Sequence, residues 1–278
     1  TPTIPGTRCE RLFGARRSAV GLVMPVSPGA SPFRTQFRSS AMRPGGRGGA
    51  GFSPASLSPY TWYDVRLGGS STQIADTSVN ARAAATYGAA TAAPTFVDGQ
   101  RYITFDGSND LVTFPTAAAP PATASDDLTI VAVFRVAGAF SATPPNIITT
   151  ATGTALASAG LRIVGNASTT EVYAVAGDGT NNASGFSARK TLTANQIAVV
   201  ALRVSSAGQT LGISVNNGTE GTVSASTVGS RAAATGYIGA VSALNRFAAM
   251  DFYAMLTFSR ALTTSELAGL VTYYGGGT

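Results

Sequence analysis

The chain has 278 residues, of which 44% are hydrophobic and only 12% are charged, and it contains one cysteine and no histidine. The missing histidine excludes Ser–His–Asp and Cys–His catalysis and disfavours a zinc hydrolase. The single thiol, Cys9, cannot form an internal disulfide, and no run approaches the roughly 20 apolar residues of a membrane span. We therefore expect a β-rich chain, made in the cytoplasm without a cleaved signal, that does not cross a membrane.

The first predicted segment is a basic arm, residues 1–52. It carries eight arginines and one acid, a net charge of +7, whereas residues 53–278 carry eleven basic and twelve acidic side chains, a net charge of −1. Six prolines and the stretch "RPGGRGGAG" at 43–51 interrupt any periodic pattern, so the arm cannot build a core of its own. It is either a solvated basic tail or a docking element that becomes ordered on a partner, and we favour the docking element.

The docking hypothesis gives two kinds of side chain a role within the arm. Arginines would pair with carboxylates of the partner, and apolar side chains would fill shallow pockets on it. The residues expected to make these contacts are Arg8, Arg11, Leu12, Phe13, Arg16, Arg17, Phe33, Arg34, Phe37, Arg38, Arg43 and Arg47. Nucleic acid is not expected as the partner, because "RPGGRGG" lacks the Lys-Ser/Thr of a phosphate loop and aromatic residues are sparse.

Short β-type runs separated by Gly, Asn, Asp and Pro begin at Ser53 and indicate a sandwich or barrel. Strands are predicted within 101–105, 126–136, 160–165, 171–177, 196–204, 209–221 and 248–258, with an Asn217-Gly218 turn in the sixth. The run 126–136 is a long apolar strand, which predicts burial on both faces. Trp62, Tyr60 and Tyr63 are either a sugar-stacking platform or core and edge residues, and their size favours the second interpretation.

The stretch "FDGSNDLVTF", residues 105–114, places two aspartates and an asparagine between apolar runs. It is a carboxylate cluster, a metal loop or a tight turn. Asp and Asn bond their own backbone, Gly107 accepts a positive φ, and one loop offers too few oxygens for the six to eight that calcium prefers. We therefore predict a β-hairpin at Asp106-Gly107-Ser108-Asn109.

Residues 248–258, "AAMDFYAMLTF", alternate with a period of two. The predicted apolar face consists of Ala248, Met250, Phe252, Ala254, Leu256 and Phe258, and the opposite face of Asp251, Tyr253 and Thr257.

Only the end of the chain, "TTSELAGLVTYYGGG", has a helical pattern. Thr263 and Glu266 form a capping box, and Gly275 provides the stop. The apolar stripe of the predicted helix consists of Leu267, Leu270, Val271 and Tyr274.

Several of these stretches resemble laminin-G-like, concanavalin A-type jelly-roll domains. "YITFDGSNDLVTF" (102–114) is similar to the family's "FDGSNDYV" motif, "LGISVNNGTEG" to its "LYVNG" hairpin, and 237–275 to its closing strands and "RALS-x-x-E" helix. "SLSPYTWYDV" (56–65) resembles the "LxLWLDA" opening found in bacteriophage structural proteins. The resemblance implies an all-β fold, an antiparallel two-sheet jelly-roll sandwich with a short C-terminal helix and an extended N-terminal arm. The predicted domains are the docking arm, 1–52, and the jelly roll, 53–278.

Carbohydrate hydrolases with this fold carry carboxylates at alternating positions of one strand, and here the sequence departs from the pattern. No strand places acids at i and i+2 or i+4, and the strand acid Asp251 stands alone. The loop "GDGTNNASG" (177–185) lacks the spaced acids of a calcium loop. We therefore expect no catalytic residues, no metal and no cofactor.

Three functions remain open at this point. The favoured hypothesis is a non-enzymatic bacteriophage virion protein, a capsid decoration, head fibre or tail appendage, whose arm binds other virion subunits. It would be located in the virion, in many copies or as a homo-oligomer, and its jelly roll would bind a host glycan through residues that the sequence does not identify. The alternatives are a free carbohydrate-binding module or lectin and, less favoured, a glucanase-type glycoside hydrolase.

Overall fold

The computed structural model describes residues 51–88, 95–97, 101–118, 127–151, 153, 158–177, 185–205, 209–224, 235–241 and 246–277. All of them belong to the unit Gly48–Thr278. The twelve residues predicted to dock a partner, from Arg8 to Arg47, lie outside the described residues, as does most of the loop 177–185.

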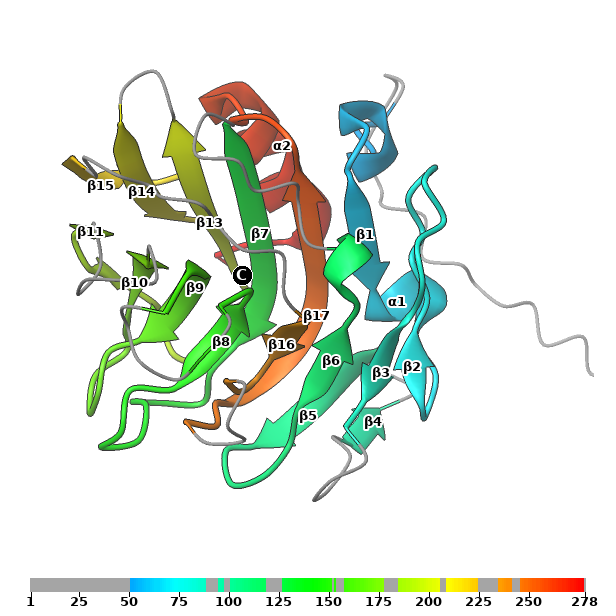
Figure 1. The fold of residues 1–278 in the computed structure, drawn as a ribbon, viewed down its shortest axis with the longest axis horizontal. Coiled ribbons are helices and arrows are strands. Elements are labelled where there is room, and N and C mark those ends of the chain that lie inside the picture. Colours follow the sequence, from blue (N-terminus) through cyan, green and yellow to red (C-terminus); the bar gives the residue numbers. More distant parts are fainter. Residues whose placement is uncertain are drawn as a thin grey trace, which may run out of the picture. The chain divides into compact units, whose positions relative to one another are not determined.

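Two antiparallel sheets face each other in this unit (Figure 1). Sheet A has eight strands in the described part of the chain: β1 (Thr61–Asp64), β4 (Thr95–Val97), β5 (Tyr102–Asp106), β7 (Leu128–Arg135), β13 (Ala198–Ser205), β14 (Thr210–Val215), β15 (Gly221–Ser224) and β17 (Ala249–Phe258). Their order is β15-β14-β13-β7-β17-β5-β4, and β1 also pairs with β17.

Sheet B has nine strands among the described residues: β2 (Gln73–Ile74), β3 (Ala85–Tyr87), β6 (Val112–Phe114), β8 (Asn146–Thr149), β9 (Gly160–Gly165), β10 (Glu171–Gly177), β11 (Gly185–Phe186), β12 (Lys190–Thr191) and β16 (Gly236–Ile238). The order is β11-β10-β9-β8-β16-β6-β3-β2, with β12 on β10. The helical segments are η1 (Pro54–Leu57), α1 (Val65–Gly68), η2 (Thr116–Ala118) and α2 (Thr264–Tyr274). The predicted all-β, antiparallel two-sheet jelly-roll sandwich with a short C-terminal helix is confirmed.

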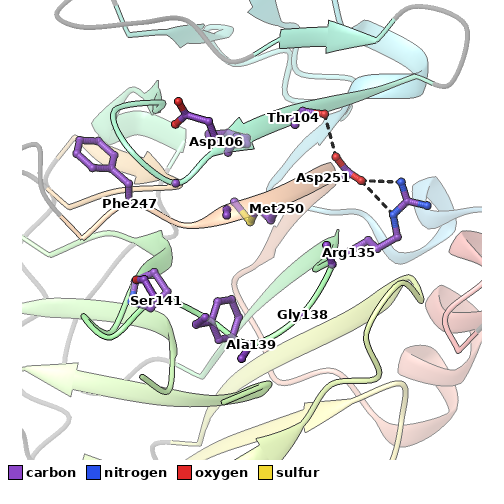
Figure 2. Close-up of a pocket in the computed structure, with 15 residues that line it drawn as sticks. Thr104, Asp106, Arg135, Gly138, Ala139, Ser141, Phe247, Met250 and Asp251 are labelled. Carbon is purple, nitrogen blue, oxygen red and sulfur yellow. Dashed lines mark hydrogen bonds and ion pairs between the residues drawn. The ribbon is translucent and has the colours of Figure 1, made fainter. Parts of the chain in front are cut away.

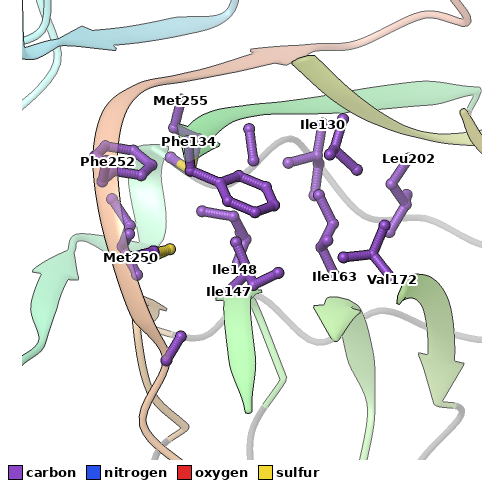
Figure 3. Close-up of a cluster of buried hydrophobic side chains, with 14 of the residues drawn as sticks. Ile130, Phe134, Ile147, Ile148, Ile163, Val172, Leu202, Met250, Phe252 and Met255 are labelled. Atoms are coloured by element: carbon purple, nitrogen blue, oxygen red, sulfur yellow. The ribbon is translucent and has the colours of Figure 1, made fainter. Parts of the chain in front are cut away.

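The main core lies between the two sheets, because alternate residues of each strand point inward. Figure 3 shows Ile130, Phe134 and Leu202 from sheet A facing side chains from sheet B. The sheet B side chains in this view are Ile147, Ile148, Ile163 and Val172. The contacts between these side chains hold the sheets face to face.

A second core lies on the opposite face of sheet A, under α2. Val131 and Val133 of β7 point into it, while Ile130 and Phe134 point into the main core. Every residue of β7 but Arg135 is buried, so the predicted burial of this strand on both faces is confirmed.

Helix α2 begins and ends where the sequence predicts. The Thr263 hydroxyl accepts from the Glu266 N–H, the Glu266 carboxylate accepts from the Thr263 N–H, and Gly275 closes the helix with a φ of 71°. Of the predicted stripe, Leu267, Leu270 and Tyr274 are buried and Val271 is half-buried. Capping and burial therefore act on the same short segment.

The predicted faces of β17 are correct only in its first half. The register against β7 shifts between Phe252 and Ala254, so Tyr253 is an extra residue and both Tyr253 and Ala254 face the second core. Ala248, Met250 and Phe252 point into the main core as predicted. Beyond the bulge, Met255 takes the main-core side, and Ala254, Leu256 and Phe258 lie under α2. The prediction of one continuous apolar face was wrong, because β17 pairs first with β5 and then with β1 along the same edge.

The stretch 105–114 forms the predicted tight turn, but it is not a hairpin. β5 pairs with β17 and β4 in sheet A, whereas β6 pairs with β16 and β3 in sheet B. The turn is therefore an arch that carries the chain from one sheet to the other. The hairpin expected around Asn217-Gly218 is confirmed, because β14 and β15 pair antiparallel on either side of it.

The aromatic residues at the start of the domain belong to its interior. Trp62 lies under α2 and Tyr63 lies in the main core, both buried, and Tyr60 is half-buried beneath the guanidinium of Arg82, 3.6 Å from the ring centre. The predicted core and edge role of these three residues is confirmed.

Candidate functional site

A pocket of about 340 Å³ opens at one end of the sandwich. It is formed by β5, the end of β7, the start of β17 and the loop 136–145, which carries the chain from sheet A to sheet B. Its lining residues are Thr104, Phe105, Asp106, Gly107, Arg135, Ala137, Gly138, Ala139, Phe140, Ser141, Pro145, Phe247, Ala249, Met250 and Asp251 (Figure 2). The turn of the 105–114 stretch therefore forms part of its wall.

Three neighbouring strands place a fixed polar row in this pocket. Asp251 of β17 lies opposite Thr104 of β5 and opposite Arg135 of β7. The Thr104 hydroxyl donates to Asp251 Oδ1 at 2.8 Å, and Arg135 donates through Nε and Nη2 to Asp251 Oδ2 at 3.0 and 2.6 Å. The hydrogen bond to Asp251 raises the pKa of Arg135, so the guanidinium stays charged.

Asp106 is a second carboxylate in the same wall. Its Oδ1 accepts from the Ser108 N–H at 2.7 Å and from the Asn109 N–H at 3.4 Å, which closes the predicted turn. Asp106 lies opposite Ala249, and Asp251 lies opposite Thr104, so the two carboxylates are diagonal neighbours on one face of sheet A. Figure 2 shows Asp106 beside Phe247 at one end of the pocket and Arg135 at the other.

This pair is not visible as alternating acids in a single strand, which is the pattern expected of carbohydrate hydrolases with this fold. Asp106 and Asp251 are 145 positions apart, and only the pairing of β5 with β17 brings them together. The available signal was that Asp106 and Asp251 both belong to polar positions of otherwise apolar strands. A comparison of strand pairs, and not of strands, would have found them.

The turn itself is held rigidly beneath the pocket. Asp110 is buried, and its Oδ2 accepts from the Asp106 N–H at 2.7 Å. Burial raises the pKa of the Asp110 carboxyl. Gly107 has a φ of +79° and packs against Ala249, where an added Cβ would lie 2.9 Å from the alanine Cβ. The turn thus fixes the position of Asp106.

The remaining wall of the pocket is apolar. Phe140 and Met250 are buried in its floor, and Phe247 is half-buried at its rim. An aromatic face and a short row of fixed donors and acceptors suit a small ligand that has both hydroxyl groups and apolar C–H faces.

Both carboxylates of the pocket already have partners in the fold. Asp251 accepts from the guanidinium of Arg135, and Asp106 accepts from two backbone N–H groups. Within the described ranges, no group of three or more His, Cys, Asp or Glu side chains is placed to hold a metal ion. No helix in the described part of the chain is long and apolar enough to cross a membrane.

Comparison with known proteins places the fold but not a family. No protein-family model matches the chain, and no curated protein matches it. A similar solved structure is the binding domain of botulinum neurotoxin serotype G, with a TM-score of 0.59 and 11% identity over 78% of this chain and 51% of that one. The binding domain of botulinum neurotoxin DC in complex with rat synaptotagmin II has a TM-score of 0.57 and 11% identity, over 79% of this chain and 52% of that one.

An enzyme is also among the similar structures. Trypanosoma rangeli sialidase in complex with the inhibitor DANA gives a TM-score of 0.54 and 15% identity over 76% of this chain and 32% of that one. The chain therefore spans about half the length of the neurotoxin chains and about a third of the sialidase. At these identities the likeness concerns the fold alone: the chain is similar to β-sandwich domains of the kind that the neurotoxins use for binding.

Proposed function

We propose that residues 53–278 form a non-catalytic glycan-binding domain of a bacteriophage structural protein, attached to other virion subunits by residues 1–52. The observation that carries the glycan-binding part is the pocket at the end of the sandwich. It combines a fixed polar row, Thr104, Asp251 and Arg135, with the aromatic rim of Phe247.

A sugar matches this combination of groups. Its hydroxyls both donate and accept, so they can donate to the carboxylates of Asp106 and Asp251 and accept from Arg135. Its C–H face packs on an aromatic ring, which Phe247 provides at the rim. Because the polar side chains already hold one another in place, little side-chain conformational entropy is lost when a ligand binds.

The non-catalytic part of the proposal rests on the contacts of the two carboxylates. Asp251 is paired with Arg135 and Asp106 accepts backbone N–H groups of the turn, so both side chains are already engaged in holding the site together. The alternative is a hydrolase that uses the diagonal pair of acids. Glycan turnover that is lost in both Asp106→Asn and Asp251→Asn would establish that alternative.

The virion part of the proposal rests on the sequence. The opening stretch 56–65 resembles that of bacteriophage structural proteins, and the arm has a net charge of +7 next to a domain of −1. Such an arm suits acidic surfaces of neighbouring subunits in a multi-copy assembly. The displayed domain would then contact the host surface.

A glycan array followed by calorimetry on the full chain tests the pocket. Phe247→Ala and Thr104→Val should each weaken binding of the selected glycan about tenfold, because one removes the aromatic rim and the other a hydroxyl of the polar row. Thr210→Val is the matched control, a half-buried strand threonine of sheet A that is not among the pocket residues. The proposal is wrong if the two pocket variants bind as tightly as the parent chain.

A further inference from the structure

The outer face of sheet B carries a group of cationic and aromatic side chains that the pocket does not use. Leu161, Ile163 and Val172 point into the main core, so their neighbours Arg162 of β9 and Tyr173 of β10 point to the outer face. The strand register places Phe186, Val175, Arg162, Thr149 and Tyr237 in one row across five strands.

A second row on this face contains Tyr173, Val164 and Asn146, again by register. Arg189 lies at the β10 end of this row, directly before β12, whose Lys190 pairs with Val172. Arg246 lies at the other end, where its carbonyl accepts from the Asn146 N–H at 2.9 Å.

Arg189 lies beside Tyr173 in the strand order, and Arg162 lies diagonally across from it on β9. Burial raises the pKa of Tyr173, and the charges of Arg189, Arg246 and Arg162 act on it in the opposite direction. Arg162 is only 2% exposed, and burial and the nearby charge of Arg246 lower its pKa to about 10. The Arg162 Nη2 donates to the Gly153 carbonyl at 2.7 Å, so Arg162 adds positive charge beneath this face but is held within the fold.

The accessible cations of the group have no carboxylate partner of their own. Neither Arg189 nor Arg246 forms an ion pair within the described part of the chain, and Arg189 is exposed. The nearest described acid on this face of β10, Glu171, accepts from the Asn166 side chain. Asn146 lies opposite Val164 in the register, and its buried Oδ1 lacks a hydrogen-bond partner in the described part of the chain.

Aromatic side chains border the same group. The Tyr173 and Phe186 rings lie 6.1 Å apart at an angle of 42°, and Phe186 is 43% exposed although it is a large apolar residue. An exposed ring beside exposed arginines fits a ligand with an apolar face and a negative charge.

We infer that this surface, formed by Arg189, Arg246, Tyr173 and Phe186 over Arg162, is a second binding site that takes an anionic sugar bearing a carboxylate or a sulfate. The arginines would hold the anionic group, and the exposed ring of Phe186, backed by the buried ring of Tyr173, would pack against the C–H face of the sugar. A nucleic acid is disfavoured because residues 53–278 have a net charge of −1, so the local cations are not part of a wide basic field. The inference goes beyond the pocket and does not require the pocket to bind.

Calorimetry on the full chain at about 150 mM salt tests this site. The probes are a galacturonic acid trisaccharide, a sulfated galactose trisaccharide and the neutral galactose trisaccharide. We expect at least one anionic probe to bind about tenfold or more tightly than the neutral one, and Arg189→Gln and Arg246→Gln to weaken that binding about tenfold each. The anionic probe that binds more tightly identifies the acidic group.

Two controls separate a site from diffuse attraction. Arg101→Gln removes the same charge from an exposed position in the turn before β5, and Arg260→Gln removes it from a position shortly before α2. Both should leave binding unchanged. The inference is overturned if these controls weaken binding as much as Arg189→Gln, if the neutral probe binds equally, or if a single-stranded oligonucleotide displaces the sugars and binds through the same arginines.

The two proposed sites can be tested independently of each other. Phe247→Ala should leave binding of the anionic probes intact, and Phe186→Ala should leave binding at the pocket intact. Loss of all binding in Phe247→Ala with none in Arg189→Gln would contradict the second site and support the pocket. The reverse result would support the second site and contradict the pocket. Melting curves of each variant confirm that the chain is folded.

Discussion

At the scale of single residues, the Tyr274 hydroxyl links the last helix to the first strand. It accepts from Trp62 Nε1 at 2.9 Å and donates to Asp64 Oδ2 at 3.1 Å, and all three side chains are buried. Burial raises the pKa of Tyr274 well above its ordinary value, so the hydroxyl keeps the proton that it donates.

Tyr274→Phe should therefore lower the free energy of unfolding by about 1–3 kcal/mol, since it leaves the buried Trp62 and Asp64 groups without this partner. Urea unfolding followed by fluorescence measures the change. Tyr273→Phe is the matched control, because Tyr273 is half-buried and no hydrogen bond of its hydroxyl holds the helix to β1. Equal losses in the two variants would contradict the role assigned to Tyr274.

Glu266 makes stability depend on pH in the acidic range. Its bidentate pair with Arg260, together with the cap at Thr263, lowers its pKa from 4.5 to about 2. Because its pKa is lower in the folded state, the ionised Glu266 carboxylate stabilises the fold at pH values above its unfolded-state pKa, near 4.5. This contribution is lost as the pH falls toward 2.

Glu266→Gln should accordingly cost about 1 kcal/mol at pH 7, a small value because Arg260 is 43% exposed and solvent screens the pair. The difference between variant and parent should shrink at pH 3. Unfolding curves at pH 7, 5 and 3 measure it, and a difference that stays constant with pH would show that the charge of Glu266 contributes nothing.

At the scale of elements, the arch between β5 and β6 depends on its glycine. Gly107→Ala should destabilise the domain by about 1–2 kcal/mol, because φ is +79° and the new methyl group would contact Ala249. Gly138→Ala is the control in the same pocket, since no atom lies within 4 Å of its added Cβ. Thermal melts compare the two, and a Gly107→Ala domain as stable as the control would show that the arch adapts.

The elements that the sequence predicted well are those whose causes are local. Helix α2 carries its own cap, stripe and stop within thirteen residues, 263–275, and it forms as predicted. The bulge in β17 and the arch at Gly107 were missed because each depends on which distant strand pairs with which. The pocket was missed for the same reason: Asp106 and Asp251 meet only through sheet A.

At the scale of the whole molecule, the excess positive charge lies in residues 1–52, whereas both described cores lie in residues 53–278. This division predicts two parts that act independently. A chain limited to residues 53–278 should unfold cooperatively, because both cores and α2 lie within it. Under the proposed function, deleting 1–52 should at the same time abolish incorporation into the proposed virion assembly. Calorimetric melting and co-sedimentation with the particle measure the two effects. A molten truncated domain, or one that attaches at normal occupancy, would contradict the predicted division of roles.

The position of β17 has a consequence for how the protein is made. This strand lies between β7 and β5 and also pairs with β1, yet it follows all three in the sequence, at residues 249–258. During synthesis on the ribosome, β1, β5 and β7 emerge long before the strand that joins them, and they expose unpaired edges until β17 follows. Sheet A can therefore close only after residue 258 has been made. A chain released before Ala249 keeps those edges open and is prone to aggregate.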